Sequence, residues 1–218
     1  MNSQYQIAAV LTAVRGLLSS SSSDSGPKIV SLEGNIGAGK STLLKAIESS
    51  LTEEEHKLIV CMQEPVDLWE SVRDAGESIL KKFYREPAKY AFAFQIMAYT
   101  SRLEALKRVL NENPGCRVLV CERSLEADKN IFALMLHDDG LIDSVSYQVY
   151  AMLFANTACQ YPVDLVLYLD VEPRECLLRV GKRARDGEGG ISLEYLTKCH
   201  EYYLAWISGM DSGAIIRV

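Results

Sequence analysis

Residues 34–41 constrain this chain more than any other segment, because their sequence, GNIGAGKS, matches the pattern G-x-x-x-x-G-K-[ST]. An apolar run at 29–33 predicts a strand directly before the motif, and residues 41–51 predict a helix directly after it. In this setting glycines let backbone N–H groups close around a phosphate, and the start of the helix adds its positive end. The alternative is a glycine-rich turn that only joins a strand to a helix. The pattern favours a site for a nucleoside triphosphate.

The motif also assigns individual roles within this site. We expect Lys40 to contact the β- and γ-phosphates of the nucleotide, and Ser41 to bind Mg²⁺ through its hydroxyl. The whole predicted phosphate-binding set is Gly34, Asn35, Ile36, Gly37, Ala38, Gly39, Lys40, Ser41 and Thr42. Taken alone, these residues predict nucleotide binding and leave the reaction open.

Strands and helices are predicted to alternate from residue 28 onward, which is typical of a parallel sheet covered by helices. The expected strands are 29–33, 58–62, 117–121, 165–170 and 214–218. The expected helices are 41–51, 88–111, 125–137, 142–156, 173–181 and 192–207. The sequence therefore predicts an α/β protein with the P-loop NTPase fold, a mainly parallel five-stranded sheet with helices on both faces. Its domain is expected to span residues 27–218.

Residues 1–26 differ in composition from this domain. Their apolar residues recur at helical spacing, their charge is low, and residues 19–23 are all serine. The apolar positions are Ile7, Val10, Leu11, Val14, Leu17 and Leu18. We expect a flexible tail ahead of the domain, with an organelle transit segment as the alternative. The corresponding location is cytoplasmic, or mitochondrial if the segment is a transit peptide.

Composition excludes several classes of protein. The 218 residues carry a formal net charge of −6, whereas a protein that binds a nucleic acid polymer presents a basic surface. No run of about 18 apolar residues is present, so no membrane span is expected. The six cysteines form no C-x-x-C pair, and we interpret them as reduced, buried thiols rather than disulfides or metal ligands.

Charged residues directly follow two of the predicted strands. Glu64 comes after strand 58–62, and Glu122 and Arg123 come after strand 117–121. Ligands of open α/β sheets bind at these strand ends. Glu64 is placed to accept a proton from an attacking hydroxyl, Glu122 to serve Mg²⁺, and Arg123 to orient the reacting oxygens. The alternatives are an exposed loop carboxylate and a structural ion pair.

A basic cluster precedes a glycine-rich run at 186–190. Arg179, Lys182 and Arg183 share one helical face, and Arg185 follows them. Such a cluster forms an arginine-rich lid that clamps a transferring phosphoryl group, or else it is an ordinary solvated face.

Five motifs in this order resemble the deoxynucleoside kinases, the deoxycytidine and deoxyguanosine kinase group in particular, from about residue 28 to the end. They are GNIGAGKST at 34–42, QEPVDLW at 63–69, FAFQ at 92–95, ERS at 122–124 and KRARDGEGGISLEYL at 182–196. The resemblance implies 5′-phosphorylation of a deoxynucleoside in nucleotide salvage, with ATP or another nucleoside triphosphate as donor and with Mg²⁺. It also implies a homodimer packed through the helices predicted at 88–111 and 142–156.

The same resemblance implies a role for each residue that matches the family's motifs. Glu64 matches the general base, Arg123 the arginine beside the 5′-oxygen, and Glu122 the carboxylate near Mg²⁺. The positions that match substrate-binding residues are Trp69 at the sugar, Tyr84 and Glu188 at the 3′-hydroxyl, Gln95 at the base edge, and Phe94 and Phe132 at the faces of the base. The lid arginines match Arg179, Arg183 and Arg185.

Three further positions bear on the choice of base. The resemblance implies that family members that accept thymidine have small or apolar residues around the 5-methyl group of the base. At the corresponding positions this chain has Ala98, Arg102 and Asp128. A buried Arg102–Asp128 pair would fill the space that a 5-methyl group needs and would offer charged partners to an amino-bearing base. We therefore expect deoxycytidine, deoxyadenosine or deoxyguanosine to be favoured over thymidine.

Two other functions are weighed against this one. A nucleoside monophosphate kinase would need room for an acceptor phosphate, which Glu64 would repel. A non-catalytic subunit of a larger assembly would have no need to keep Lys40, Glu64 and the lid arginines together. The resemblance further implies a segment beyond the last strand that packs on the donor base. The C-terminus at Val218 is therefore expected to be short.

Overall fold

The computed structural model describes residues 3–20 and 26–218 and has a five-stranded sheet in the order β2-β5-β1-β6-β7. Every neighbouring pair in this sheet is parallel, with β1 at the centre between β5 and β6. The strands are β1 (Lys28–Gly34), β2 (Ile59–Met62), β5 (Val118–Glu122), β6 (Leu165–Leu169) and β7 (Ile215–Arg217). The predicted α/β fold with a parallel five-stranded sheet is confirmed.

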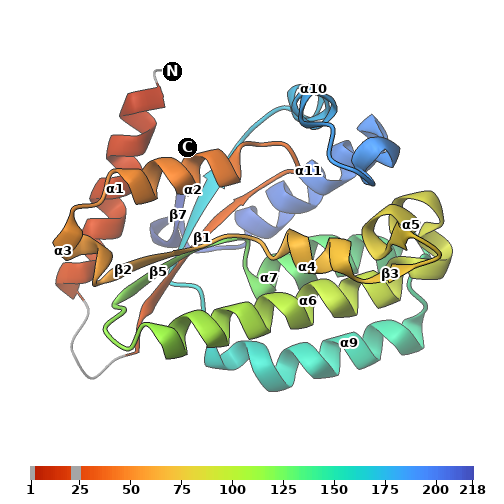
Figure 1. The fold of residues 1–218 in the computed structure, drawn as a ribbon, viewed down its shortest axis with the longest axis horizontal. Coiled ribbons are helices and arrows are strands. Elements are labelled where there is room, and N and C mark those ends of the chain that lie inside the picture. Colours follow the sequence, from red (N-terminus) through yellow and green to blue (C-terminus); the bar gives the residue numbers. More distant parts are fainter. Residues whose placement is uncertain (1–2, 21–25) are drawn as a thin grey trace.

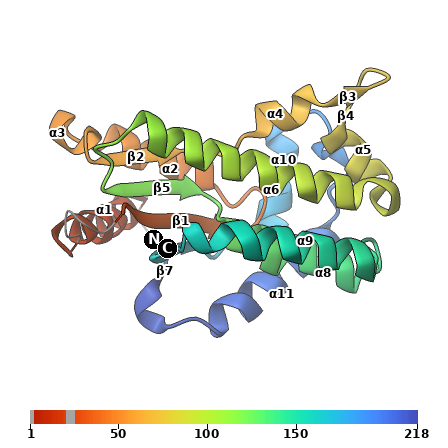
Figure 2. The ribbon, with the colours of Figure 1, turned by 90° about the horizontal axis from the view of Figure 1, so that it is seen from below.

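Helices cover both faces of this sheet (Figure 1). On one face lie α1 (Ser3–Ser20) and α2 (Lys40–Ser49), and across the sheet lie α6 (Pro87–Glu112) and α9 (Ser144–Thr157). Seen from below, α6 and α9 run side by side (Figure 2). The remaining long helices are α10 (Pro173–Arg183) and α11 (Leu193–Ser208). Pro173 opens α10 at a position where its missing N–H costs no helical hydrogen bond.

The two faces are separated by the alternation of side chains along each strand. Val30 and Leu32 of β1 pack with Leu44 and Ile47 of α2. Ile29 of the same strand points the other way and packs with residues of α6. Successive residues of a strand project to opposite faces, and a parallel sheet buried on both faces is therefore apolar almost throughout. The exceptions on β1 are the buried Ser31 and Glu33.

The N-terminal segment differs from the predicted flexible tail. Residues Ser3–Ser20 form helix α1, and Val10, Leu11 and Val14 are buried against the core formed by β1, β5, β6 and α2. The helical spacing of the apolar residues thus matches the structure, and the surface that they cover is the sheet face that also carries α2. Arg15 additionally pairs with Glu55 at 2.6 Å. The end of the serine run and the junction ahead of residue 26 lie outside the described residues.

Short elements on either side of β2, between α2 and α6, were not predicted. They are α3 (Glu53–His56), α4 (Val66–Ser71), the antiparallel hairpin of β3 (Arg73–Asp74) and β4 (Glu77–Ser78), and α5 (Ile79–Arg85). Thr52 caps α3 in a capping box with Glu55, and the Ser78 hydroxyl caps α5. These elements matter because α4 and α5 form one wall of the pocket described below.

The helix predicted at 125–137 consists of three consecutive segments. They are α7 (Leu125–Ala127), the π-helical η1 (Asp128–Ala133) and α8 (Leu134–Asp138). A π-helical turn widens the helix and re-aims its side chains, and such turns are common at functional sites. Here it carries Asp128 and Phe132, both of which line the pocket.

Short 3-10 turns complete the chain at Ala158–Gln160, Glu188–Gly190 and Ser212–Ala214. Among the helices of residues 3–20 and 26–218, not one has the length and apolar character needed to cross a membrane.

Candidate active site

The glycine-rich loop connects β1 to α2 as predicted. Gly37 has φ +83°, and a Cβ on this residue would lie 2.5 Å from the Cys176 carbonyl oxygen of α10. Gly39 precedes α2 with φ +105°. Only glycine fits both requirements, because a side chain would be strained at this φ and would also collide at Gly37. The sequence thus lets the loop fold tightly over the N-terminus of α2.

Lys40 extends from this loop into the site. Its Nζ donates to the carbonyl oxygens of Asn35 at 2.9 Å and Gly34 at 3.1 Å, and the side chain is buried. Burial, followed by repulsion from Arg123, lowers the pKa of Lys40 to about 8 even though nearby carboxylates act in the opposite direction. A lysine held inside a phosphate loop supplies positive charge to a nucleotide's phosphate oxygens.

Not all of the predicted loop residues face the same cavity. Ile36, Gly37, Lys40 and Ser41 line the main pocket. Ala38, Gly39 and Thr42 line a neighbouring cleft, together with Ile7 of α1 and Arg179 of α10. Gly34 and Asn35 line neither, because Gly34 packs on β6 and the buried Asn35 amide donates to the Leu196 carbonyl oxygen at 2.7 Å. Asn35 therefore fixes the loop to α11.

Ser41 and Glu122 meet beside the loop. The Ser41 hydroxyl donates to Glu122 Oε1 at 2.7 Å, and both side chains line the pocket. Hydroxyl and carboxylate oxygens are the ligands that Mg²⁺ prefers, and this ion is usually held by few protein oxygens plus substrate phosphates. Within the part of the chain that the structure describes, no group of three or more His, Cys, Asp or Glu could hold a metal ion. The Ser41–Glu122 pair suits the kind of site in which the phosphates complete the coordination.

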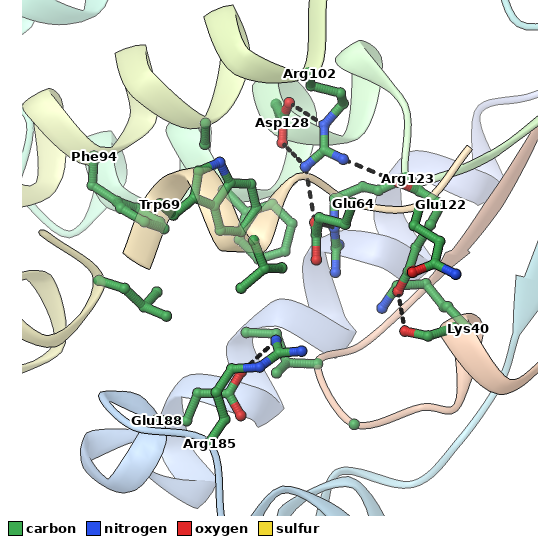
Figure 3. Close-up of a pocket in the computed structure, with 18 of the residues that line it drawn as sticks. Lys40, Glu64, Trp69, Phe94, Arg102, Glu122, Arg123, Asp128, Arg185 and Glu188 are labelled. Atoms are coloured by element: carbon green, nitrogen blue, oxygen red, sulfur yellow. Dashed lines mark hydrogen bonds and ion pairs between the residues drawn. The ribbon is translucent and has the colours of Figure 1, made fainter. Parts of the chain in front are cut away.

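Glu64 is held at one oxygen by two guanidinium groups. Arg102 donates to Glu64 Oε1 at 2.9 Å and Arg123 Nε donates to the same atom at 3.1 Å (Figure 3). Burial alone would raise the pKa of Glu64, but the charges of Arg123, Arg102 and Lys40 lower it to about 2. Glu64 therefore remains an ionised carboxylate at neutral pH. Among the described residues no hydrogen bond reaches its Oε2, and the side chain lines the pocket.

Arg102 connects this carboxylate to Asp128. Its Nε donates to Asp128 Oδ2 at 2.8 Å, and a third nitrogen donates to the Glu122 carbonyl oxygen at 3.0 Å. The guanidinium is 1% exposed and Asp128 is 2% exposed. The predicted buried Arg102–Asp128 pair is present, and it also contacts Glu64, which was not predicted. Burial would raise the pKa of Asp128, and Arg102 opposes that rise.

Arg123 sits in an unusual backbone conformation at the end of β5. Its φ of +69° is rare for a residue with a side chain. The guanidinium lies over the Phe132 ring at 4.5 Å and contacts both Glu64 and the Tyr203 hydroxyl. This geometry aims a fixed positive charge at the pocket next to Glu64.

Aromatic side chains form the far end of the pocket. Phe94 stacks on Phe83 at 4.6 Å and meets Trp69 edge-on at 5.6 Å. Trp69 donates its indole N–H to Ser101 at 2.8 Å. Phe94 and Phe132 both line the cavity, as does Ala98. These residues form apolar walls suited to a planar ring.

Gln95 is the polar group within this apolar end. It is 2% exposed, and its Oε1 has no hydrogen-bond partner among the described residues. A buried, unpaired amide oxygen is costly unless a ligand donates to it. The amide offers both a donor and an acceptor to the edge of a ring.

The segment after α10 closes the pocket opposite Arg102 (Figure 3). Glu188 is buried and accepts from Arg183 at 2.7 Å and from Arg185 at 3.2 Å. Tyr84 of α5 also lines the pocket, and burial followed by the charge of Glu188 raises its pKa. Arg179, by contrast, points to the loop backbone, where it donates to the Ala38 carbonyl oxygen at 3.0 Å. The three predicted lid arginines are thus split between two cavities.

Some pocket residues were missed from the sequence. They are Lys45, Gln63, Val66, Asp67, Leu80 and Tyr195. Gln63, Val66 and Asp67 lie within the QEPVDLW motif and Tyr195 within the last motif, so their motifs carried a usable signal. Lys45 and Leu80 have no comparable signal, because their placement depends on how α2 and α5 pack.

A parallel sheet with a phosphate loop on its central strand, beside a pocket that contains an ionised carboxylate, defines the class of P-loop small-molecule kinases. The sequence profile of the deoxynucleoside kinases matches residues 30–218. A probable deoxycytidine kinase of fowlpox virus is 34% identical, in an alignment that covers 83% of this chain and 72% of the length of the viral protein. Human deoxycytidine kinase is 31% identical over 88% of this chain and 81% of its own. A thymidine kinase of Ictalurid herpesvirus 1 is 33% identical over 83% of this chain and 74% of the length of the viral protein.

The chain therefore belongs to the deoxynucleoside kinase family and is a deoxynucleoside kinase. Its substrates are a nucleoside and a nucleotide phosphate donor.

Proposed function

We propose that this kinase transfers the γ-phosphoryl group of ATP to the 5′-hydroxyl of a deoxynucleoside in nucleotide salvage, and that it favours deoxycytidine, deoxyadenosine or deoxyguanosine over thymidine. The observation that carries the proposal is the position of Glu64. Two arginines hold its Oε1, while its Oε2 is free of hydrogen bonds from the described residues and the side chain faces the pocket beside Lys40. This arrangement supports a general base that is oriented and ionised before substrate binds.

The reaction follows from this geometry. Glu64 Oε2 accepts the 5′-hydroxyl proton as that oxygen forms a bond to the γ-phosphorus, and the bond from phosphorus to the β,γ-bridging oxygen breaks to release ADP. Arg123 holds the attacking oxygen and stabilises charge on the passing phosphoryl group. Arg183 and Arg185 line the same pocket, where both donate to Glu188. Positioning and electrostatics supply most of the rate in such reactions.

Mg²⁺ would be held by Ser41 and Glu122 together with the donor phosphates. When bound, it supplies positive charge that neutralises the phosphate oxygens. The residues of the chain do the rest: the loop N–H groups and Lys40 bind the phosphates, and the aromatic walls exclude water from the acceptor.

The base preference is supported by the polar atoms at the closed end of the pocket. Phe94 and Phe132 would contact the faces of the base and Gln95 its edge. Tyr84 and Glu188 would bind the 3′-hydroxyl. The Arg102–Asp128 pair occupies the remaining space with charged groups, which disfavours a methyl group and favours an amino group. Thymidine is the second candidate, because the Ictalurid herpesvirus 1 relative is a thymidine kinase.

The test is an assay of the purified protein with ATP, Mg²⁺ and each of the four deoxynucleosides, with monophosphate product as the readout. Formation of a 5′-monophosphate from an amino-bearing deoxynucleoside supports the proposal. Product from thymidine at equal efficiency would overturn the preference, and absence of product from all four would overturn the function. Replacing ATP by UTP or GTP tests which phosphate donor the protein prefers. Removing Mg²⁺ with a chelator tests whether the reaction requires the metal ion.

We further propose a homodimer that packs through α6 and α9. Val145, Val149 and Met152 of α9 are 71%, 51% and 66% exposed and lie near one another at helical spacing. Sedimentation should show a dimer that Val149→Asp disrupts. The matched control is Leu178→Asp on α10, where an equally exposed apolar residue stands away from this stripe. A wild-type monomer at micromolar concentration would contradict the proposal.

A further inference from the structure

Glu33 is a buried carboxylate that the proposed reaction does not use. It lies on β1 directly before the phosphate loop, is 0% exposed, and does not line the pocket. Its Oε1 accepts from the Ser31 hydroxyl at 2.6 Å, and from the Ser124 N–H at 2.8 Å and hydroxyl at 2.6 Å. Its Oε2 accepts from the Tyr203 hydroxyl at 3.1 Å. Burying a carboxylate is unfavourable unless donors replace water, and here four donors do so.

Two of these donors belong to the residue that follows Arg123. Arg123 occupies the left-handed region, where a residue with a side chain is strained unless its surroundings hold it. Its own N–H donates to the Leu32 carbonyl oxygen of β1 at 3.0 Å, and the next N–H, that of Ser124, donates to Glu33. Consecutive residues of β1 therefore fix the backbone on both sides of the strained position.

A third donor connects Glu33 to the Arg123 side chain. The Tyr203 hydroxyl of α11 donates its single proton to Glu33 Oε2, which leaves its oxygen lone pairs free to accept from Arg123 Nη1. Without the carboxylate this proton would lose its acceptor, because a guanidinium only donates. The opposite edge of Arg123 donates from Nε to Glu64 Oε1 at 3.1 Å. Glu33, Tyr203, Arg123 and Glu64 thus form one continuous chain of hydrogen bonds.

We propose that Glu33 and Tyr203 are positioning residues for phosphoryl transfer, an inference that rests on the proposed function. Glu33 holds the strained turn at Arg123 through Ser124 and orients the guanidinium through Tyr203. Arg123 in turn holds the general base. Neither Glu33 nor Tyr203 lines the pocket, so their replacement should lower kcat and leave deoxynucleoside binding nearly unchanged.

The test compares single and double variants by steady-state kinetics. Tyr203→Phe removes only the hydroxyl, and we expect kcat to fall about tenfold with the KM for deoxynucleoside changed less than about twofold. Glu33→Gln should lower kcat further, since an amide nitrogen that faces Tyr203 would leave that hydroxyl proton without its acceptor. In an Arg123→Ala background, Tyr203→Phe should change kcat less than about twofold, because its effect is transmitted through the guanidinium.

Ser31→Ala is the matched control. It removes a buried hydrogen bond to the same carboxylate but leaves the contacts of Glu33 with Ser124 and Tyr203 in place, so wild-type kcat is expected. If wild-type protein forms no monophosphate, the proposed function fails. If wild-type protein is active and Tyr203→Phe keeps its kcat, or if Ser31→Ala and Tyr203→Phe lower kcat equally, the positioning role fails. Should Glu33→Gln not fold, which thermal unfolding would show, Tyr203→Phe alone decides the result.

Discussion

The phosphate loop is one continuous segment, 34–42, whereas the pocket that we propose for the acceptor draws its side chains from α4, α5, α6, β5, η1 and the turn after α10. The loop works through backbone atoms, and its glycines are required by φ angles and by close packing on α10. The pocket works through side chains, which are held by pairs such as Arg102–Asp128 and Arg183–Glu188. Nucleotide binding is thus a local property of the chain, and acceptor choice is a property of its packing.

This difference has a consequence for mutation. A change in the loop should weaken the donor's interactions whatever the acceptor, because every donor presents the same phosphates. A change in the pocket should alter the choice among nucleosides or the proton transfer and leave donor binding intact. Variants at Glu64, Lys40 and the Arg102–Asp128 pair separate the two regions on that basis.

The largest effect is expected for Glu64→Gln. The amide keeps the shape of the side chain but cannot accept the proton, so kcat should fall about 1,000-fold. The dissociation constant of the deoxynucleoside, measured by calorimetry, should change less than about threefold. Near-normal turnover of this variant would show that Glu64 does not accept the proton. The main functional difference between the pocket and the phosphate loop would then be lost.

Lys40→Met should lower kcat about 100-fold for every acceptor alike, because a charge that faces the phosphates is lost. In the wild-type protein, kcat/KM should also decline as pH rises through about 8, since the pKa of Lys40 is lowered to that value and its protonated form is the active one. Lys40→Arg tests the assignment, because a guanidinium stays protonated in this range. A basic limb near pH 8 that survives in Lys40→Arg would belong to another group.

Replacing both members of the buried pair, with Arg102→Met and Asp128→Ala together, should shift the ratio of kcat/KM values toward thymidine about tenfold. Both must change, because removing Arg102 alone would leave the buried charge of Asp128 unpaired and destabilise the protein. The KM for ATP should stay within about twofold of the wild-type value. An unchanged ratio among the four deoxynucleosides would mean that this pair does not set the preference.

The smallest effect on activity is expected at α1. Val14 is fully buried under the sheet face that carries α2, so Val14→Ala should lower the free energy of unfolding by about 2 kcal/mol. Turnover should match that of the wild type below the unfolding transition. Leu178→Ala is the control, because this exposed position should change stability by less than about 0.5 kcal/mol. Equal stability of the Val14 variant and wild-type protein in urea titrations would argue against the packing of α1.

The N-terminal segment and the loop show where pattern reading succeeds and where it stops. The apolar spacing of Ile7, Val10 and Val14 indicated a helix, and a helix is present. Nothing in that spacing states which surface the helix covers, so the segment was predicted as a tail. The same limit applies to α4 and α5, which are short and pack against each other and against α6. Secondary structure follows local patterns, but docking depends on distant residues.

The amino-acid sequence alone determined the parallel sheet, the phosphate loop and the carboxylate after β2. Each of these features follows from residues that are close together in the sequence and from the alternation of strands and helices along the chain. Packing in three dimensions decided the rest. It brought Arg102 and Arg123 to one oxygen of Glu64. It also connected Glu33 to Arg123 through the Tyr203 hydroxyl. Charge interactions depend on separation and burial, and neither quantity exists until α6, β5 and α11 have packed around the site.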